Sequence, residues 1–404
     1  MCSAKVLPRL LVFSSLFPSE INPNLGGFIR ERMFRVAAQT PIVVLAPQVW
    51  SPIDWILRLK WKSYRRLARE YEVLDGIEIY RPKVLSIPVI FKSYDGFFMA
   101  YFSGKAVKKI VERFKPNLVD AHFCYPDGYA ASIIAKQLKL PLVITLRGSR
   151  DERLVESDQA PLLRKALAQC VHVIAVSDAL KKGVGQRLGI PSEKITVVGN
   201  GVNLDRFEQM DRAASRARLG IAPTDLVMVS VGNLNTLKGF HRLIDLLPNL
   251  RKLFPTLKLV IVGAQLSGDP TAKQLKNQVQ TLGVSDMVQF AGYVDSNEMK
   301  WYYSAANLFV SATAYEGWAN VLLEAMACGL PIVTTRVGGN PQVVCSDALG
   351  FLIEFWDPIL AEQTIAAALT NDWNVGQIKA YAVANRWEAR MQALDDIFNK
   401  SIAC

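Results

Sequence analysis

The sequence predicts an α/β protein with two doubly wound domains, because short apolar runs alternate with longer amphipathic stretches from end to end. Most of these runs are four to eight residues long and rich in Val and Ile, as strands buried on both faces of a parallel sheet are. Repeated alternation of such strands with helices is typical of doubly wound folds. The length of 404 residues suits two or three domains.

Each expected strand is defined by one apolar run. In the first half of the chain the runs are residues 10–17, 42–46, 118–122, 142–146, 171–176 and 195–198. In the second half they are residues 226–231, 257–262, 287–291, 307–311 and 331–334. The stretches between them show helical periodicity, as in residues 240–254, where the apolar positions are Leu243, Ile244, Leu247 and Leu250.

The expected domain boundary lies near residues 201–224, which hold one short charged helix and no core strand. The charge balance changes at the same place. Residues 1–200 carry 30 Lys and Arg against 17 Asp and Glu, whereas residues 201–404 carry 17 against 19. The sequence therefore divides into a basic half and a nearly neutral half, with no internal repeat of about 20–50 residues.

Several protein classes are excluded by composition. No apolar stretch reaches the roughly 18–20 residues that a membrane-spanning helix needs, and the apolar opening at residues 10–17 has no signal-peptide cleavage pattern. The six cysteines are far apart and form no C-x-x-C pair, which argues against a zinc site and a disulfide framework. We therefore expect a reducing, cytoplasmic compartment, no metal and no nucleic-acid partner.

Two glutamates flank an expected helix N-terminus in the second half of the chain. Glu316 follows the expected strand 307–311, and Glu324 lies in the first turns of a helix that should end at Gly329. Phosphates favour helix N-termini at this edge of a doubly wound sheet, and carboxylates on either side suit the vicinal hydroxyls of a sugar nucleotide. On spacing alone, a helix-capping Glu and an exposed helix Glu remain the favoured interpretation.

Several sequence blocks, in order, resemble the retaining glycosyltransferases of family 4, which have the GT-B fold. The resemblance implies two Rossmann-like domains facing across a cleft: an N-terminal acceptor domain (1–205), joined by a C-terminal helix (376–404), and a nucleotide-sugar donor domain (206–375). It extends from about residue 10 to about residue 355. The blocks are LFPSEINPNLGGFIRERM, DAHFCYPDGYAA, TLRGSR, AVSDAL, VVGNGVNLDRF, VGNLNTLKGFHRLI and the E-x7-E block EGWANVLLEAMACGLPIVTTRVGGNPQVV.

The resemblance also implies roles for single residues. Glu316 would contact the donor hexose near the reaction centre, and Glu324 would hold the ribose hydroxyls. Lys238 would bind the diphosphate, where a cation offsets the charge that grows on the leaving group. His122 would lie near the primary hydroxyl of the sugar, although a lone His at a strand end is more often a hydrogen-bonded core residue. The rest of the implied donor site consists of small and loop residues, namely Gly26, Gly27, Gly317, Trp318, Ala319, Asn320 and Val321.

The chain departs from the family pattern at two positions. Asn233 stands where the family usually has an Arg that supplies a second cation to the diphosphate; Arg147 and Arg336 are candidates to compensate. Gln342 replaces a common Glu and is expected to shape its loop. Arg30 and Arg147 are also candidates for acceptor or phosphate contacts, although Arg30 would equally suit a solvated helix face.

Residues 55–72 (WILRLKWKSYRRLAREYE) predict a basic amphipathic helix. Its Trp and Tyr side chains share one face, and its Arg and Lys side chains line another, as in helices that lie in an anionic membrane surface. The alternative is a helix that packs on its own domain with a solvated charged face. The basic character of this half favours the membrane.

The resemblance implies a retaining transferase that moves a hexose-type sugar from a nucleotide sugar, UDP- or GDP-linked, to a hydroxyl of a glycan or polyprenyl-linked oligosaccharide. The expected context is cell-surface or exopolysaccharide biosynthesis, in the cytoplasm or peripherally on the inner face of the plasma membrane, without metal or cofactor. Three alternatives remain open: a degenerate sugar-nucleotide-binding protein, motivated by Asn233, and an epimerase or a phosphorylase on the same fold.

Overall fold

The computed structural model describes residues 7–23, 25–60, 64, 66–86, 92–265, 269–354 and 357–403. The chain divides into two compact units. Unit 1 comprises residues 1–200 and 390–404, and unit 2 comprises residues 201–389. The boundary thus lies at residue 200 rather than 205, and residues 376–389, expected with the N-terminal domain, belong to unit 2.

Unit 1 is built on an eight-stranded sheet with the order β10-β9-β8-β7-β1-β2-β5-β4. Every pairing in it is parallel except that of β4 with β5. The two central strands, β1 and β7, are buried along their whole length, as their apolar runs predict. The strands are β1 (Leu10–Phe13), β2 (Ile42–Leu45), β4 (Tyr71–Leu74), β5 (Ile77–Tyr80), β7 (Leu118–His122), β8 (Leu142–Leu146), β9 (His172–Ala175) and β10 (Ile195–Val197).

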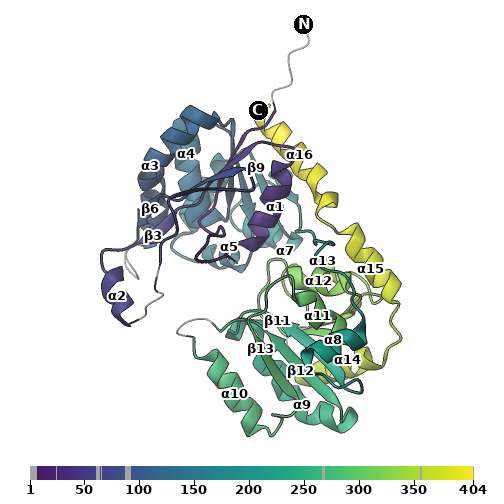
Figure 1. Cartoon of the computed structure of the whole chain (residues 1–404). Helices are drawn as coiled ribbons and strands as arrows, with labels where there is room; N and C mark the ends of the chain where they lie inside the picture. The colour runs from purple at the N-terminus through teal and green to yellow at the C-terminus, as the bar shows by residue number, and fades with distance from the viewer. Residues whose placement is uncertain are drawn as a thin grey trace. The chain divides into compact units, whose positions relative to one another are not determined.

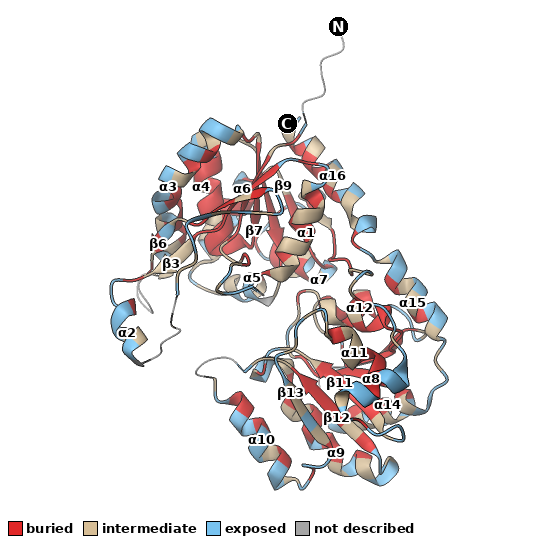
Figure 2. Cartoon of the chain, viewed as in Figure 1, coloured by how far each residue is buried: buried red, intermediate tan, exposed pale blue. Residues whose placement is uncertain are grey.

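Helices flank this sheet, and a separate parallel pair joins β3 (Gln48–Trp50) to β6 (Lys83–Leu85) (Figure 1). The C-terminal helix α16 (Glu388–Ile402) returns to unit 1, where Leu394, Ile397 and Phe398 enter the core. The buried faces of the helices turn toward the sheet (Figure 2). The other helices are α1 (Gly27–Ala37), α2 (Asp54–Lys60), α3 (Asp95–Phe114), α4 (Tyr129–Leu138), α5 (Ser149–Leu154), α6 (Ala160–Gln169) and α7 (Asp178–Leu180).

Unit 2 contains a six-stranded, all-parallel sheet with the order β13-β12-β11-β14-β15-β16. Two apolar clusters cover its faces, one of them formed with α9 and the other with α12 and α15. The strands are β11 (Leu226–Val231), β12 (Leu257–Val262), β13 (Val288–Gly292), β14 (Leu308–Ser311), β15 (Ile332–Thr335) and β16 (Gly350–Ile353). The helices are α8 (Arg212–Leu219), α9 (Phe240–Leu253), α10 (Thr271–Thr281), α11 (Met299–Ala305), α12 (Asn320–Ala327), α13 (Asn340–Val343), α14 (Pro358–Thr370) and α15 (Val375–Ala384).

All eleven strands predicted from apolar runs are present, within a few residues at their ends. The first is shorter than expected, because the chain leaves the sheet after Phe13. The strand at residues 288–292 is an edge strand with half-exposed side chains, so the expectation of burial on both faces is wrong there. Strands β3, β4, β5, β6 and β16 were not predicted, because they are short or alternate with polar residues.

Two expected helices are corrected. The helix expected over residues 55–72 ends at Lys60, and Tyr71 and Glu72 belong to β4, which pairs antiparallel with β5; residues 61–63 and 65 lie outside the described part. The last helix, expected to be continuous, is broken between α15 and α16, where Val202 forms a bridge with Arg386. In the described part of the chain, no helix is long and apolar enough to cross a membrane.

Candidate functional site

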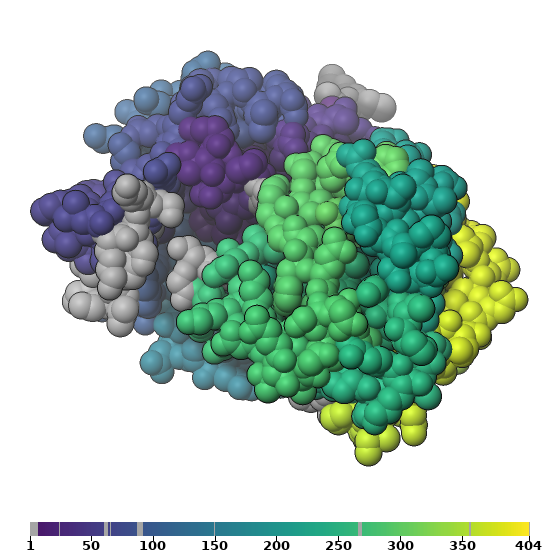
Figure 3. Space-filling view, turned by 60° about the horizontal axis from the view of Figure 1, so that its bottom comes forward, coloured from purple at the N-terminus to yellow at the C-terminus, as the bar shows by residue number. Residues whose placement is uncertain are grey.

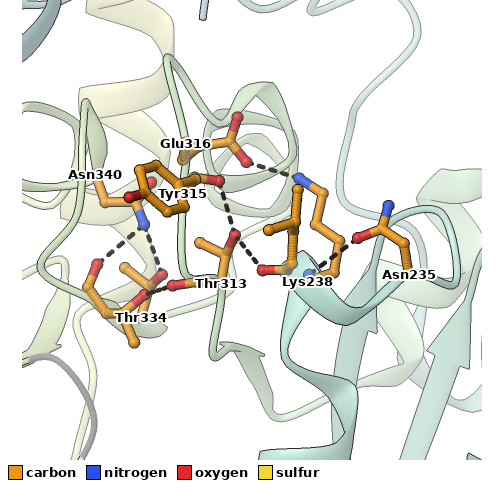
Figure 4. Close-up of polar contacts among 9 residues, drawn as sticks. Asn235, Lys238, Thr313, Tyr315, Glu316, Thr334 and Asn340 are labelled. Carbon is orange, nitrogen blue, oxygen red and sulfur yellow. Dashed lines mark hydrogen bonds and ion pairs between the residues drawn. The ribbon is translucent and has the colours of Figure 1, made fainter. Parts of the chain in front are cut away.

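An ion pair joins two loops at the carboxyl edge of the unit 2 sheet. Lys238 Nζ lies 2.7 Å from Glu316 Oε2, although the residues are far apart in the sequence (Figure 4). Lys238 ends a short turn after β11, and the Asn235 side chain caps that turn by accepting a hydrogen bond from the Lys238 N–H. Both partners of the pair are largely buried, with 28% and 17% of their side chains exposed.

Two glycines allow the loops to meet backbone to backbone. Gly239 has a φ of +71°, and a Cβ there would lie 2.0 Å from the Ala312 carbonyl oxygen. Gly338 has a φ of +52°, and its Cβ would lie 1.5 Å from the Glu316 carbonyl oxygen. Any other residue would push the loops apart, so these glycines allow the loops to approach closely enough for Lys238 to contact Glu316.

A network of hydroxyl and amide groups fixes the loop that carries Glu316. Thr313 Oγ1 lies 3.1 Å from the Leu237 carbonyl oxygen and 3.0 Å from that of Tyr315. Thr335 Oγ1 donates to the Thr313 carbonyl at 2.6 Å, and Asn340 Nδ2 donates to the Thr335 carbonyl at 3.0 Å (Figure 4). The loops after β11, β14 and β15 therefore form one platform.

Helix α12 begins directly beside this platform. Its N-cap is Ala319, which provides no side-chain hydrogen bond to the first turn, so the first N–H groups of the helix have no cap of that kind and can meet an anion. The lead-in loop contains Trp318, whose buried Nε1 has no hydrogen-bond partner among the described residues. The expected stretch from Gly317 to Val321 thus lies at the start of α12, as the sequence predicted.

Glu324 lies in the second turn of α12. Its Oε2 accepts a hydrogen bond from the hydroxyl of Tyr303 on α11 at 2.9 Å. Tyr303 is completely buried, and burial together with the Glu324 carboxylate raises the pKa of its hydroxyl well above the ordinary value. Tyr303 stays protonated and orients Glu324. The sequence motif contained no signal for this contact.

Asn233 is exposed in the loop after β11 and brings no cation to the site. One of the two candidates to compensate, Arg336, pairs with Glu354, and the other, Arg147, belongs to unit 1. Sequence reasoning did not consider another cation of unit 2, Arg242, in the first turn of α9, whose Nη1 donates to the Ala312 carbonyl at 3.0 Å. Its place in the first turn of the helix that follows the Lys238 turn was the available signal.

His122 occupies the end of β7 in unit 1 and is fully buried. Its Nδ1 lies 2.8 Å from Arg147 Nη2. Since a guanidinium only donates hydrogen bonds, Nδ1 must accept, and the ring proton must be on Nε2. Burial, together with Arg147 and Arg32, lowers the pKa of His122 well below its ordinary value, so the imidazole is neutral.

Other buried charges surround this histidine. Asp120 Oδ2 lies 3.6 Å from His122 Nε2, and burial raises the pKa of Asp120 to about 7 against the opposing effect of the two guanidiniums. Arg147 Nη1 and Arg32 Nη2 both donate to Asn200 Oδ1, at 3.1 and 3.3 Å. The structure thus brings His122 and Arg147 together in one polar network, which the sequence did not predict.

The Gly-Gly loop leads into α1. Gly26 is the N-cap of that helix, with a φ of +66°, and a Cβ there would lie 2.0 Å from the Leu16 carbonyl oxygen. Gly27 has no such neighbour within 4 Å. Arg30 pairs with Asp75 at 3.2 Å and lies over the Phe34 ring. Of the two glycines, only Gly26 has a structural reason to be glycine.

Comparison with known proteins identifies the class. The fold is GT-B: the solved structure of sucrose-phosphate synthase from Thermosynechococcus elongatus matches 98% of this chain and all of its own at a TM-score of 0.77 and 20% identity. The solved structure of Anabaena HepE in complex with UDP matches 97% of this chain and all of its own, at a TM-score of 0.73 and 19% identity. Residues 42–206 match the model "Glycosyltransferase Family 4" and residues 211–385 the model "Glycosyl transferases group 1". The chain therefore belongs to the family 4-like glycosyltransferases.

Curated relatives agree with this assignment. A D-inositol 3-phosphate glycosyltransferase from Segniliparus rotundus is 28% identical over 296 residues, which are 70% of this chain and 66% of the relative. The putative teichuronic acid biosynthesis glycosyltransferase TuaC of Bacillus subtilis is 27% identical over 339 residues, 82% of each chain. A second D-inositol 3-phosphate glycosyltransferase, from Streptomyces bingchenggensis, is matched over 56% of its length, so the chain spans less than two thirds of some of these relatives.

Proposed function

We propose that this chain transfers a hexose from a UDP- or GDP-linked sugar to a hydroxyl of a glycan or polyprenyl-linked oligosaccharide, with retention of configuration. The observation that carries the proposal is the Lys238–Glu316 pair beside the N-terminus of α12. A cation and uncapped helix N–H groups suit a diphosphate. Glu316 and Glu324 then provide hydrogen-bond acceptors for sugar hydroxyls on either side of the diphosphate.

The chemistry follows from the charges in this site. Departure of a nucleoside diphosphate builds negative charge, which Lys238 and the start of α12 would stabilise. Glu316 is held by Lys238 and is therefore a positioning carboxylate rather than a free nucleophile. This arrangement is compatible with a retaining reaction in which the acceptor hydroxyl attacks on the face of the leaving group and the departing phosphate takes its proton. Such a reaction depends on orientation more than on an acid–base pair.

Relatives support the donor and the biological context. The solved structures of HepE are described as complexes with UDP and with UDP-glucose, and TuaC is named for teichuronic acid biosynthesis. We propose that the reaction belongs to cell-surface or exopolysaccharide biosynthesis and needs no metal or cofactor. In the described part of the chain, no three His, Cys, Asp or Glu residues are grouped so that they could hold a metal ion.

The experiment is a thermal-shift screen of the full chain against UDP, GDP, ADP and their common sugar conjugates, followed by a transfer assay with the nucleotide that binds. A ligand of the native state raises the unfolding midpoint by mass action. We expect one nucleotide family to do so and its sugar conjugate to be consumed. If no nucleotide shifts the midpoint, the proposal is wrong.

Asn233 favours a second candidate, a protein that binds a sugar nucleotide without transferring the sugar. The exposed Asn233 leaves the diphosphate without the second cation that the family resemblance implies. This candidate predicts nucleotide binding with neither hydrolysis nor transfer. Restoring the cation by Asn233→Arg should then create activity, whereas an active wild-type protein would exclude this candidate.

A further inference from the structure

A cavity of about 350 Å³ opens in unit 1, at the edge of the sheet where parallel strands end. The residues after β1, β2, β5 and β7 all contribute to its wall, through Leu16, Pro47, Arg81 and Pro126 respectively. Ligands of doubly wound sheets bind at this edge. Every described residue in its lining belongs to unit 1.

The cavity is strongly basic. Among the described residues, the charged ones in its lining are four cations, Arg66, Arg81, Lys92 and Arg150, and one carboxylate, Asp95. Asp95 is already engaged, because its Oδ2 lies 3.1 Å from Lys92 Nζ and its Oδ1 accepts from the Ser86 hydroxyl at 3.0 Å. Arg81 is likewise paired with Glu72, so the excess positive charge that an entering anion would meet includes Arg150, to which the described part of the chain gives no ion pair.

Of these four cations, Arg81 is the buried one. Only 3% of the residue is exposed. Its Nη2 donates to the Pro18 carbonyl at 2.6 Å and pairs with Glu72 Oε1 at 2.6 Å, while its buried Nη1 has no hydrogen-bond partner among the described residues. A buried guanidinium N–H without an acceptor is costly, and an anionic ligand in the cavity would supply that acceptor.

The wall that carries Arg66 is held in place by a side chain from β3. Gln48 Nε2 donates to the Ala68 carbonyl at 2.9 Å, and Gln48 Oε1 accepts from the Ala68 N–H at 2.8 Å. These paired bonds mimic a strand contact and fix the segment against β3. Arg66 lies two residues before the anchored Ala68.

Arg150 reaches the cavity from α5. It is exposed, and the described part of the chain gives it no hydrogen bond or ion pair. Burial raises the pKa values of two carboxylates, Asp127 and Asp151, and the charge of Arg150 acts on both to lower them. Both accept hydrogen bonds from other groups: Asp127 from the Ser15 hydroxyl, and Asp151 from the backbone N–H of Cys124. Its guanidinium therefore remains available to a ligand.

We propose that this cavity binds an anionic group, a carboxylate or a phosphate, carried by the acceptor. The inference rests on the proposed function, because it names the class of acceptor for that transfer: an acidic or phosphorylated sugar rather than a neutral one. Guanidinium groups recognise both anions through paired N–H···O bonds. Arg81 supplies a preformed buried donor, and Arg66 and Arg150 supply cations at the wall.

The test measures binding of four probes to the full chain by isothermal titration calorimetry: glucuronic acid, glucose 6-phosphate, inorganic phosphate and glucose. We expect the anionic sugars to bind and glucose to fail. Arg150→Gln should weaken anion binding about tenfold, as the loss of a charge-assisted hydrogen bond does. Arg153→Gln removes the same charge from the same helix outside the cavity and is the matched control.

The outcomes separate this inference from the proposed function. If UDP- or GDP-sugars bind but no anionic sugar does, or if glucose binds as well as glucuronic acid, the acidic-acceptor inference is overturned and the donor site stands. Equal weakening by Arg150→Gln and Arg153→Gln would also overturn it, since the effect would then be one of net charge. Preference for glucose 6-phosphate or for glucuronic acid identifies the source of the anion. Arg81→Lys, which retains the charge but loses the fork, should weaken binding while thermal unfolding shows that the protein is folded.

Discussion

The Lys238 ammonium lies 2.7 Å from the Glu316 carboxylate, and this ion pair links the loop after β11 to the loop after β14. The pair is partly solvated, and its direct contribution to stability is about 1 kcal/mol or less. Its importance is positional. A cation that already has a carboxylate partner is held at one point, ready to exchange part of that contact for a diphosphate.

Glu316→Gln tests the role of this pair in transfer. The amide keeps the shape but loses the charge that orients Lys238, so we expect transfer to fall by about 100-fold or more with little change in the unfolding midpoint. Initial rates with the donor identified by the binding screen provide the measurement. Glu298→Gln, which removes a carboxylate from an exposed pair with Arg218, should leave the rate unchanged. An active Glu316→Gln protein would contradict the assigned site.

Glu324→Ala should weaken nucleotide binding and also destabilise unit 2. The substitution leaves the Tyr303 hydroxyl, which is completely buried, without its acceptor, at a cost of about 1–3 kcal/mol. Calorimetric titration with the nucleotide, done where both proteins are fully folded, separates the two effects. The variant Tyr303→Phe retains the Glu324 carboxylate but loses the hydrogen bond that orients it. The nucleotide affinity of this variant should therefore lie between those of the wild type and Glu324→Ala. Unchanged affinity in Glu324→Ala would exclude contact with the ribose.

Gly26 and Gly27 should respond differently to substitution by Ala. Gly26→Ala places a Cβ against the Leu16 carbonyl at a φ of +66° and should lower the free energy of unfolding by about 2 kcal/mol or more. In Gly27→Ala the new methyl group meets no atom within 4 Å, and we expect full stability. Denaturant unfolding of both variants checks this. A loss of donor affinity in folded Gly27→Ala would support the predicted approach of this loop to a ligand, and a destabilised Gly27→Ala would contradict the geometry.

His122 should make stability fall in mild acid. Its pKa is lowered in the folded state but is about 6.5 in the unfolded chain, so the unfolded state binds a proton first and becomes favoured as the pH falls below about 6.5. The free energy of unfolding should therefore decrease steadily as the pH falls from 7 to 5. The comparison is with His122→Gln, measured by denaturant unfolding at each pH. The raised pKa of Asp120 has the opposite effect, since it stabilises the folded protein as the pH falls. Asp120 is present in both proteins that are compared. Parallel pH profiles would show that His122 does not titrate as described.

The segment around α2 remains the candidate for an anionic membrane surface. Trp55 and Leu59 are 64% and 77% exposed, and the helix lies at the surface of unit 1 (Figures 1 and 3). Exposed Trp and Leu beside cations suit the lipid interface. We expect vesicles that contain anionic lipid to pellet less of the double variant Trp55→Ser, Leu59→Ser, and less of a variant with Arg58, Lys62, Arg65 and Arg69 changed to Ser. Ile359→Ser, an equally exposed apolar position in unit 2, should pellet like the wild type. Equal pelleting of all variants would remove the membrane from the proposal.

The amino-acid sequence alone determined the elements whose physics is local or repeated. Each of the eleven apolar runs became a strand, because a run of Val and Ile flanked by polar residues gains most from burial in a parallel sheet. The residues from Glu316 to Glu324 were correctly placed before and within a helix, since the run of helix formers and the stop at Gly329 are sequence signals.

Tertiary structure decided whatever depends on partners distant in the chain. Residues 71 and 72, predicted as the end of the helix 55–72, instead begin β4, because β5 offers a hydrogen-bonding edge that outweighs weak local propensity. The contact of Lys238 with Glu316 and that of Tyr303 with Glu324 arise between segments that meet only when the sheet forms. The same holds for the burial of Arg81, whose Nη1 finds no hydrogen-bond partner in the described part of the chain. Sequence spacing specifies which groups are available, whereas packing alone fixes the distances at which charge and hydrogen bonding act.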